Sequence, residues 1–221
     1  MALTGLKSSC VNMSGPYPGV FVTLEGGEGV GKSTAASGFA ALLRAEGQEV
    51  LLTREPGGTK GAEAIRSLLL SQDVPLTPMA QTMLHFAARA DHVEQVIRPA
   101  LARGAVVICD RFYDSTMAYQ AYGQGVPATD IDALIKLVGL TPDVTFLLHV
   151  PDKTAQQRLT ARASGVDRYE SLGLDFFQQV QAGFEAIARA HPDRFVRVEA
   201  SASAGEVVAD LRRHLRERLG R

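Results

Sequence analysis

The stretch GGEGVGKST, residues 26–34, decides the fold. It matches the pattern G-x-x-x-x-G-K-[ST] and stands between an apolar run and an apolar-periodic helical segment, the context in which this pattern forms a phosphate-binding loop. Its glycines let backbone amides turn toward an anion, Lys32 can reach the terminal phosphates of a nucleotide, and the Ser33 hydroxyl can hold Mg²⁺. A glycine-rich turn that merely caps a helix is the alternative, which the joint occurrence of strand, motif and helix disfavours. We therefore predict an ATP-binding loop made of Gly26, Gly27, Glu28, Gly29, Val30, Gly31, Lys32, Ser33 and Thr34.

Around this loop, short apolar runs alternate with helical patterns. Segments such as 34–47 and 174–191 repeat apolar residues three and four positions apart, as amphipathic helices do. Runs that are hydrophobic at nearly every position suit strands covered on both faces. We predict an α/β fold, a P-loop nucleotide-binding fold with a five-stranded, mainly parallel sheet and helices on both faces, as one domain over residues 20–221. The predicted strands are VFVTLE (20–25), VLLT (50–53), AVVICD (105–110), VTFLLHV (144–150) and FVRVEA (195–200).

Asp110 ends one of these apolar runs. An apolar strand that ends in Asp contributes to the metal site of P-loop hydrolases and transferases. A solvated strand end is the alternative, but beside the phosphate loop the metal interpretation is favoured. We predict that Ser33 and Asp110 hold Mg²⁺. Arg111 follows directly, at the sheet edge where ligands of open α/β folds bind.

Composition restricts the partners. The chain has 221 residues, a net charge of −1 and two cysteines, Cys10 and Cys109. This charge argues against a broad nucleic-acid or membrane footprint, and no apolar run approaches the roughly 18 residues of a membrane-spanning helix. Two cysteines are too few for a disulfide framework and fit a reducing cytoplasm. We expect small-molecule partners.

Two segments stand apart from the alternating pattern. Residues 1–19 form a polar leader without the apolar core of a secretory signal; we expect it to be disordered, and we hypothesise that translation begins at Met13. Residues 161–173 are interrupted by polar residues and glycines and form a candidate mobile lid. On composition alone, an ordinary surface loop is the favoured interpretation of the second segment.

Arginine is dense in and around these motifs. Fixed guanidinium groups neutralise and orient phosphates, so their number indicates an anionic acceptor for the phosphoryl group. For Arg158, on a predicted helix, a solvated surface position is favoured. No N-K-x-D guanine-reading motif is found. The arginines concerned are Arg54, Arg66, Arg89, Arg111, Arg158, Arg162 and Arg168.

Four motifs together resemble bacterial thymidylate kinases. They are GGEGVGKST, TREPGGT after the second strand, AARADHVEQVIRPAL on a long helix, and CDRFYDSTMAYQ. The resemblance covers nearly the whole chain from Val20. It implies transfer of the γ-phosphoryl group of ATP to dTMP, giving dTDP and ADP, with Mg²⁺ and as a homodimer.

The resemblance also implies roles for individual residues. Glu28 matches an acidic position near the sugar 3′-hydroxyl. Arg54 and Arg111 match positions that hold the monophosphate, and Arg89 matches the arginine that reads a thymine carbonyl. Positions beside the base or lining the same pocket are matched by Thr116, Gln120 and Arg66.

Two departures from the family pattern affect the expected site. Where the family usually places a Phe that stacks on thymine, one helical turn before the base-reading arginine, this chain has His85, which is the direct match and can also stack on a base. Phe86 could take that place only if the helix is rotated locally, and a partly buried His85 without base contact is the alternative. The phosphate loop contains no arginine, so the catalytic arginines are expected in the lid. There, Arg162 and Arg168 are the candidates, and Arg162 is the preferred transition-state contact.

The sequence is also compatible with two other functions. One is a kinase for another nucleoside monophosphate or for a deoxynucleoside on the same core. The other is a regulatory module that binds ATP without transferring phosphate. The second is disfavoured, because a binding module has no need for preorganised charge around a second phosphate.

Overall fold

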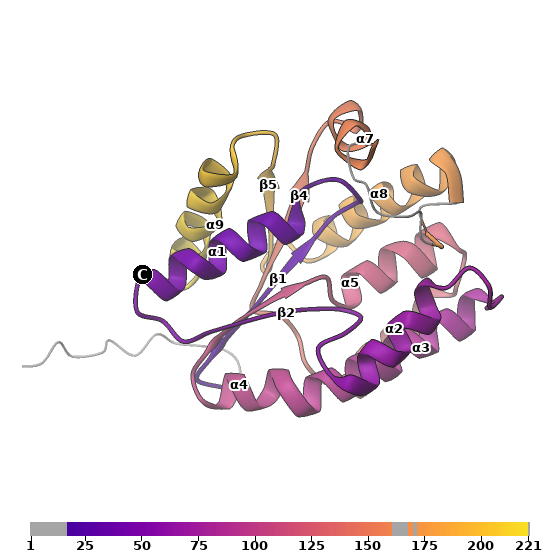
Figure 1. Ribbon diagram of the computed structural model, residues 1–221, viewed down its shortest axis with the longest axis horizontal. Helices are drawn as coiled ribbons and strands as arrows, with labels where there is room; N and C mark the ends of the chain where they lie inside the picture. Colours follow the sequence, from indigo (N-terminus) through magenta and orange to yellow (C-terminus); the bar gives the residue numbers. More distant parts are fainter. Residues whose placement is uncertain (1–16, 161–167, 170–171, 221) are drawn as a thin grey trace, which may run out of the picture.

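Five parallel strands form one sheet in the computed structural model, which describes residues 17–160, 168–169 and 172–220. The sheet order is β2-β3-β1-β4-β5, and each neighbouring pair is parallel (Figure 1). The predicted α/β fold is confirmed, and each strand lies within one residue of its predicted ends. The strands are β1 (Val20–Glu25), β2 (Val50–Arg54), β3 (Val106–Asp110), β4 (Val144–His149) and β5 (Phe195–Glu199).

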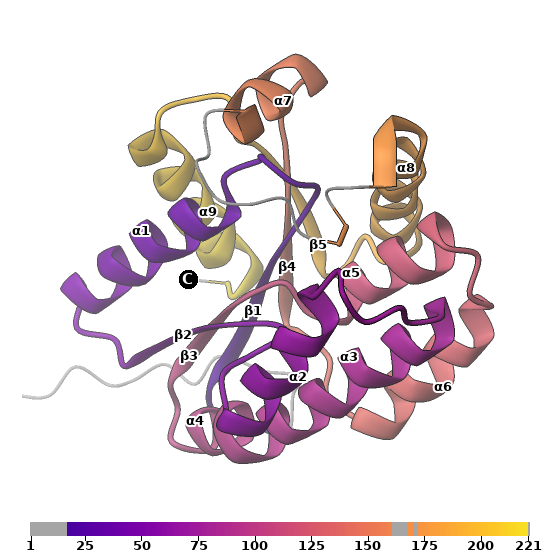
Figure 2. The ribbon, with the colours of Figure 1, turned by 45° about the vertical axis from the view of Figure 1, so that its right-hand side comes forward.

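Helices cover both faces of the sheet. Two of them, α1 (Lys32–Ala45) and α9 (Ala204–Arg218), pack together on one face, and the larger group covers the other (Figure 2). A further helix, α7 (Asp152–Thr160), lies beyond the carboxyl end of β4. The larger group comprises α2 (Lys60–Leu70), α3 (Pro78–His92), η1 (Val93–Ile97), α4 (Arg98–Ala102), α5 (Tyr113–Thr116), η2 (Met117–Gly123), α6 (Ala128–Val138) and α8 (Gly173–Ala190).

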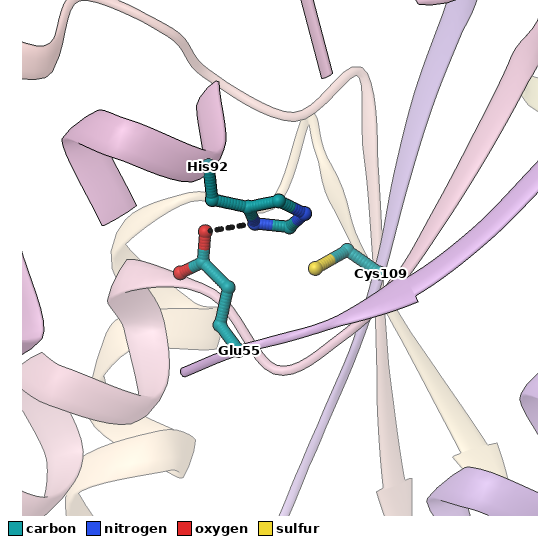
Figure 3. A group of neighbouring side chains, drawn as sticks. All are labelled: Glu55, His92 and Cys109. Carbon is teal, nitrogen blue, oxygen red and sulfur yellow. Dashed lines mark hydrogen bonds and ion pairs between the residues drawn. The ribbon is translucent and has the colours of Figure 1, made fainter. Parts of the chain in front are cut away.

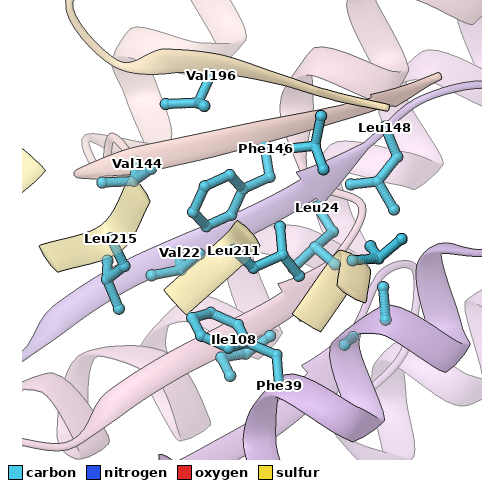
Figure 4. Close-up of a cluster of buried hydrophobic side chains, with 14 of the residues drawn as sticks. Val22, Leu24, Phe39, Ile108, Val144, Phe146, Leu148, Val196, Leu211 and Leu215 are labelled. Carbon is cyan, nitrogen blue, oxygen red and sulfur yellow. The ribbon is translucent and has the colours of Figure 1, made fainter. Parts of the chain in front are cut away.

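The central strand β1 is buried on both faces. Its alternate residues Val22 and Leu24 pack against Phe39 of α1 and Leu211 of α9, as Figure 4 shows. Phe21 points to the opposite face and joins the second apolar cluster. Because successive strand residues point to opposite faces, a continuous apolar run is what a doubly covered strand requires. Burial of a side chain as large as that of Phe39 contributes about 1.5–3 kcal/mol to stability.

Residues 78–102 form one long helical segment with a wider turn near its end. The α-helix α3 passes into the π-helical η1, in which the amide of Arg98 donates to the carbonyl of Val93, before α4 continues. Pro99 follows in α4. Proline has no amide hydrogen and its ring crowds the preceding turn. A wider turn just before Pro99 accommodates both effects without ending the segment.

The sheet brings the predicted motifs to one edge. Because all the strands are parallel, their carboxyl ends share that edge. The chain leaves β1 at Glu25 and enters the phosphate loop, and β3 ends there at Asp110. Gly31 precedes α1 with φ 93°, a left-handed conformation that glycine adopts at little cost.

Both segments that stand apart lie partly outside the described residues. Of the leader, Tyr17 to Gly19 are described; Tyr17 contacts Arg98, and the Gly19 amide donates to the carbonyl of Leu101 at 3.0 Å. These three residues therefore pack on the domain, although we assigned them to the leader. Of the lid, residues 168, 169, 172 and 173 are described. None of the described helices is both long and apolar enough to cross a membrane.

Candidate active site

A cavity of about 480 Å³ lies at the carboxyl edge of the sheet. Most of the predicted site residues line it, while Gly26, Gly27, Val30, Phe86 and Arg168 are not among its lining residues, and Arg162 lies outside the described residues. The structure therefore brings the phosphate loop and the expected acceptor residues to one space. The predicted residues that line it are Glu28, Gly29, Gly31, Lys32, Ser33, Thr34, Arg54, Arg66, His85, Arg89, Asp110, Arg111, Thr116 and Gln120.

Lys32 is the buried cation of the phosphate loop. Its Nζ donates to the carbonyl of Gly27 at 2.6 Å, and the residue is 6% exposed. Burial, followed by the positive charge of Arg111, lowers the pKa of Lys32 to about 8. An anionic phosphate beside this ammonium would oppose both effects.

Ser33 and Asp110 meet across the loop and the end of β3. The Ser33 hydroxyl donates to Asp110 Oδ2 at 2.6 Å, and both residues line the cavity. Mg²⁺ prefers oxygen ligands and usually takes one or two protein groups together with substrate phosphates and water. A hydroxyl and a carboxylate in contact, facing the phosphate loop, fit that preference.

Arg111 is bound from several sides. Its guanidinium donates to the Gly26 carbonyl at 3.0 Å, to Ser115 Oγ at 2.9 Å, to Glu28 at 2.5 Å and to Tyr119 Oη at 3.2 Å. Burial acts to lower the pKa of Arg111, but the Glu28 carboxylate together with Tyr119, Asp110 and Glu25 outweighs it and raises that pKa above its ordinary value. The backbone is left-handed here, with φ 67°, which is uncommon for a residue other than glycine. Observed backbone strain of this kind clusters at functional sites.

Glu25 supports Arg111 through Ser115, which accepts a hydrogen bond from Arg111 and donates one to Glu25. Its carboxylate accepts hydrogen bonds from the amide of Phe112 at 2.7 Å and from the hydroxyl of Ser115 at 2.5 Å. The residue is fully buried at the end of β1. Burial, followed by the charge of Asp114, raises the pKa of Glu25 to about 8.

Arg89 lines the cavity and is itself held by protein groups. Its Nε donates to Glu55 Oε2 at 2.7 Å and its Nη2 to Thr116 Oγ1 at 3.1 Å. The guanidinium carbon lies 4.6 Å from the centre of the Phe86 ring and 5.2 Å from that of Phe112. Among the described residues, Arg89 Nη1 is a buried polar atom without a hydrogen-bond partner. The side chain is thus fixed from two sides while one donor is left for a ligand.

His85 and Phe86 take different places. His85 lines the cavity, and burial, followed by the charge of Arg89, lowers the pKa of its imidazole to about 3, so the ring is neutral. Phe86 is 4% exposed and packs in the apolar cluster behind Arg89. His85 is therefore the ring of the two that faces the ligand space.

Two further predicted acceptor arginines have protein partners. Arg54 is exposed and pairs with Glu63 at 3.0 Å. Arg66 donates from Nη1 to the carbonyl of Pro56 at 2.9 Å. Both line the cavity on the side of the TREPGGT motif.

Arg158 and Arg168 do not lie where the sequence suggested. Arg158 donates to the carbonyls of Val30 and Ala200, at 3.3 and 3.1 Å, and lines the cavity, so its expected solvated position was wrong. The helix that carries it packs over the phosphate loop. Arg168 donates from Nε to the carbonyl of Leu69 at 3.0 Å and makes further bonds to carbonyls just after α2.

Comparisons with known proteins show the family of this chain. A family model described as thymidylate kinase matches residues 24–211. The chain is 51% identical to the thymidylate kinase of Gluconobacter oxydans over 205 residues, 91% of this chain and 96% of that protein. It is 48% identical to the thymidylate kinase of Caulobacter vibrioides, again over 205 residues, with 91% and 98% covered. The chain belongs to the thymidylate kinase family.

A solved structure agrees with this membership of the thymidylate kinase family. The crystal structure of thymidylate kinase from Ehrlichia chaffeensis superposes with a TM-score of 0.74 at 33% identity, covering 89% of this chain and 98% of that one. Coverage of this extent means that the sheet and its helices are shared, and not the phosphate loop alone.

Several residues of this thymidylate kinase site were missed from the sequence. Glu25, Glu55, Ser115 and Tyr119 orient the predicted arginines, yet none belongs to the phosphate-loop pattern. Tyr169, which also lines the cavity, stands in the candidate lid. The signal that could have found the first two is a carboxylate at or just after the end of an apolar strand, the same signal that pointed to Asp110.

Behind Arg89, this member of the thymidylate kinase family has a buried polar cluster of Glu55, His92 and Cys109, shown in Figure 3. Their candidate ligand atoms lie within 4.8 Å of one another. Both nitrogens of His92 are already bonded, to Glu55 at 3.0 Å and to Thr53 at 2.8 Å. Burial raises the pKa of the Cys109 thiol well above its ordinary value, whereas a metal ligand must be a thiolate. The cluster therefore supports Arg89 through Glu55 and does not fit a metal ion.

Proposed function

We propose that the cavity binds ATP at the phosphate loop and dTMP at the wall of Arg89, and transfers the γ-phosphoryl group to dTMP, giving dTDP and ADP. Membership of the thymidylate kinase family gives the reaction itself. The assignment of residues to steps is our proposal.

One observation carries this assignment: donor-side and acceptor-side groups open into the same cavity. Lys32 and Ser33 of the phosphate loop line this cavity, and so do Arg89 and Gln120. Arg111 also lines it and is bonded to the phosphate loop through Gly26 and Glu28. A site that only bound ATP would not need this second charged wall.

Phosphoryl transfer between two phosphates depends on position and charge. Lys32 would hold the terminal phosphates of ATP, while Arg111 would hold the acceptor phosphate and draw the two anions together. No covalent intermediate is needed, since the two oxygens can be held in line. Arg158 and the lid residue Arg162 are further candidates for contact with the transferred group.

Mg²⁺ would be held by Ser33 and Asp110, whose side chains already meet at 2.6 Å. The ion supplies charge neutralisation at the phosphates when it is bound. The hydroxyl and carboxylate present at this position support its assignment.

The base would lie against Arg89, Thr116 and Gln120, with His85 beside it. A neutral pyrimidine needs a donor for its carbonyl and an acceptor for its N–H. Arg89 Nη1 and Gln120 Oε1 are buried and have no hydrogen-bond partner among the described residues. They supply one group of each kind.

We also propose a cytoplasmic homodimer. Met83 of α3 and Leu137 of α6 are 59% and 83% exposed, on helices that contact each other. A contiguous exposed apolar patch favours an interface, and we propose that these two side chains belong to one. Light scattering of wild type and Leu137→Glu tests this: a dimeric mass that the charge reduces to a monomer supports it, and a monomeric wild type contradicts it.

The function is tested by ADP formation with ATP, Mg²⁺ and a panel of dTMP, dUMP, dCMP, dAMP and thymidine. We expect dTMP to be preferred, and Arg89→Ala to weaken its use. The matched control is Arg197→Ala, which removes an exposed arginine paired with Glu185. Preference for another acceptor would overturn the base assignment, and ATP binding without acceptor-dependent ADP would indicate a binding module.

A further inference from the structure

Tyr169 joins three polar side chains in the wall of the cavity. Its hydroxyl lies 2.9 Å from His85 Nε2, 3.2 Å from Gln81 Oε1 and 3.3 Å from Gln120 Nε2. Tyr169, Gln81 and Gln120 are 7%, 4% and 1% exposed. At such burial the direction of each hydrogen bond matters, since a mismatched pair of polar atoms is costly.

The direction of the whole chain of bonds is fixed at the carbonyl of Leu76. A carbonyl only accepts, so the side-chain amide that contacts it at 2.9 Å, Gln81, must present its NH₂ group there. The oxygen of Gln81 therefore faces Tyr169. Because an amide oxygen also only accepts, the single hydroxyl proton of Tyr169 goes to Gln81.

The Tyr169 oxygen must then accept from its other two neighbours. His85 is neutral, because burial lowers the pKa of its ring to about 3, and it donates through Nε2. Gln120 donates through its NH₂ group, so its Oε1 points elsewhere. That oxygen is buried and has no hydrogen-bond partner among the described residues.

Two buried atoms beside the cavity that have no hydrogen-bond partner among the described residues form a donor and acceptor pair. Arg89 Nη1 is a donor and Gln120 Oε1 is an acceptor, and both residues line the cavity beside Thr116. Thymine presents an acceptor at its 4-carbonyl and a donor at N3–H. Cytosine presents the reverse, a 4-amino donor and an N3 acceptor. A reversed Gln120 amide would therefore favour cytosine at N3.

We propose that Tyr169 is a positioning residue that sets acceptor specificity, because its hydroxyl holds the Gln120 amide in the orientation that accepts from a thymine-type base. This inference rests on the proposed function. It assigns the choice between thymine and cytosine to a hydroxyl that is oriented by Gln81 and need not touch the base.

The test is equilibrium binding of dTMP and dCMP without ATP, by calorimetry, to wild type and Tyr169→Phe. The substitution keeps the ring, which packs edge-on against Tyr119 at 5.6 Å, and removes only the hydroxyl. With Gln120 free to turn, we expect dTMP to bind more weakly and dCMP more tightly. The Kd for dCMP divided by the Kd for dTMP should fall about tenfold, the equivalent of one net hydrogen bond.

A second variant, at a residue outside the cavity lining, changes the orientation of the same Gln120 amide. Gln81→Met removes the acceptor of the Tyr169 proton, which can then be donated to Gln120 and reverse it. Gln81 is not among the lining residues, so a change in the dTMP to dCMP ratio would come through Tyr169. Tyr122→Phe is the matched control, since Tyr122 is 44% exposed and does not line the cavity.

Steady-state kinetics give a second readout: KM for dTMP should rise in Tyr169→Phe while KM for ATP stays unchanged. A parallel weakening of dTMP and dCMP would overturn the inference, since it would indicate a structural role only. The inference would also be overturned if wild type prefers dTMP and the ratio of the Kd for dCMP to the Kd for dTMP is unchanged in both Tyr169→Phe and Gln81→Met. A wild type with no preference for dTMP would contradict the proposed acceptor itself, and this inference with it.

Discussion

The carboxylate of Glu28 lies 2.5 Å from the guanidinium of Arg111. This contact joins the phosphate loop, which follows β1, to the first residue after β3. Tyr119 adds a bond of 2.9 Å to the same carboxylate oxygen. The donor loop and the proposed phosphate-binding arginine are therefore held together by the protein's own hydrogen bonds.

Replacement of Arg111 should abolish most turnover and leave the fold intact. We expect Arg111→Ala to lower kcat about a hundredfold to a thousandfold, the scale seen when one preorganised charge at a transition state is removed. Arg111→Lys should also be poor, because an ammonium cannot donate to Gly26, Ser115 and Glu28 in the directions of the guanidinium. Arg197→Ala is the control, and near-normal turnover of Arg111→Ala would contradict the assignment.

The affinity for ATP should depend on pH through Lys32. Its pKa is lowered to about 8 by burial and by Arg111, so the free enzyme loses this charge above pH 8. Bound phosphate favours the charged form, so the Kd for ATP should rise by only about twofold from pH 7 to 8 and above pH 8 by up to about tenfold per unit. Titration calorimetry from pH 7 to 9.5 measures this.

Lys32→Arg provides the control for that pH series. Arginine keeps its charge over the whole pH range, so the Kd for ATP should no longer change with pH, even if ATP binds more weakly at every pH. A wild-type Kd that does not change up to pH 9.5 would argue against Lys32 as the group that titrates.

Asp110→Asn should weaken the response to Mg²⁺. The amide keeps the size of the side chain but loses the charge beside Ser33, so the Mg²⁺ concentration at half-maximal activity should rise about tenfold or more. Activity is measured against free Mg²⁺ at saturating ATP. Asp132→Asn, an exposed change on α6, is the control, and identical Mg²⁺ curves for the two variants would refute the role of Asp110.

Glu25 should make stability depend on pH. Its folded-state pKa, about 8, lies above the ordinary glutamate pKa of 4.5, because of burial and the charge of Asp114. The folded state therefore binds more protons between these values, and the contribution of Glu25 to stability is present below pH 4.5 and is lost as the pH rises toward 8.

Glu25→Gln isolates this effect. The amide can still accept from the Phe112 amide, and it carries no charge, so the variant should melt at a higher temperature than wild type near pH 8 and similarly near pH 5. A change of about 2–4 °C in this difference corresponds to about 1 kcal/mol for a domain of this size. Melting curves of both proteins at several pH values measure it, and a constant difference would count against a raised pKa.

The sheet and the phosphate loop could be predicted because their signals are local. Each strand is a continuous apolar run, and the loop is a contiguous pattern whose glycines adopt the backbone conformations that it needs. Asp110 was identified in the same way, from its place at the end of a run. The sequence order of strands and helices then left few arrangements for a parallel sheet.

The contacts of individual side chains could not be predicted, because they depend on segments far apart in the chain. Arg158 shows this: its helix packs so closely on the loop that a Cβ at Gly29 would lie 2.5 Å from the carbonyl of Ala155, which brings Arg158 to the phosphate loop. Tyr169 meets His85 across 84 positions of sequence. No periodic pattern records such a pair.

The bonds of Arg168 also bear on how this enzyme could be redesigned. Its guanidinium donates to the carbonyls of Leu69, Ser71 and Val74, around the end of α2. Every residue type has the same backbone carbonyl, so the contacts of Arg168 depend on the backbone conformation after α2 and not on the side chains there. A chimera that imports another lid would therefore need the host loop after α2 to keep this length and course, whatever its side chains are.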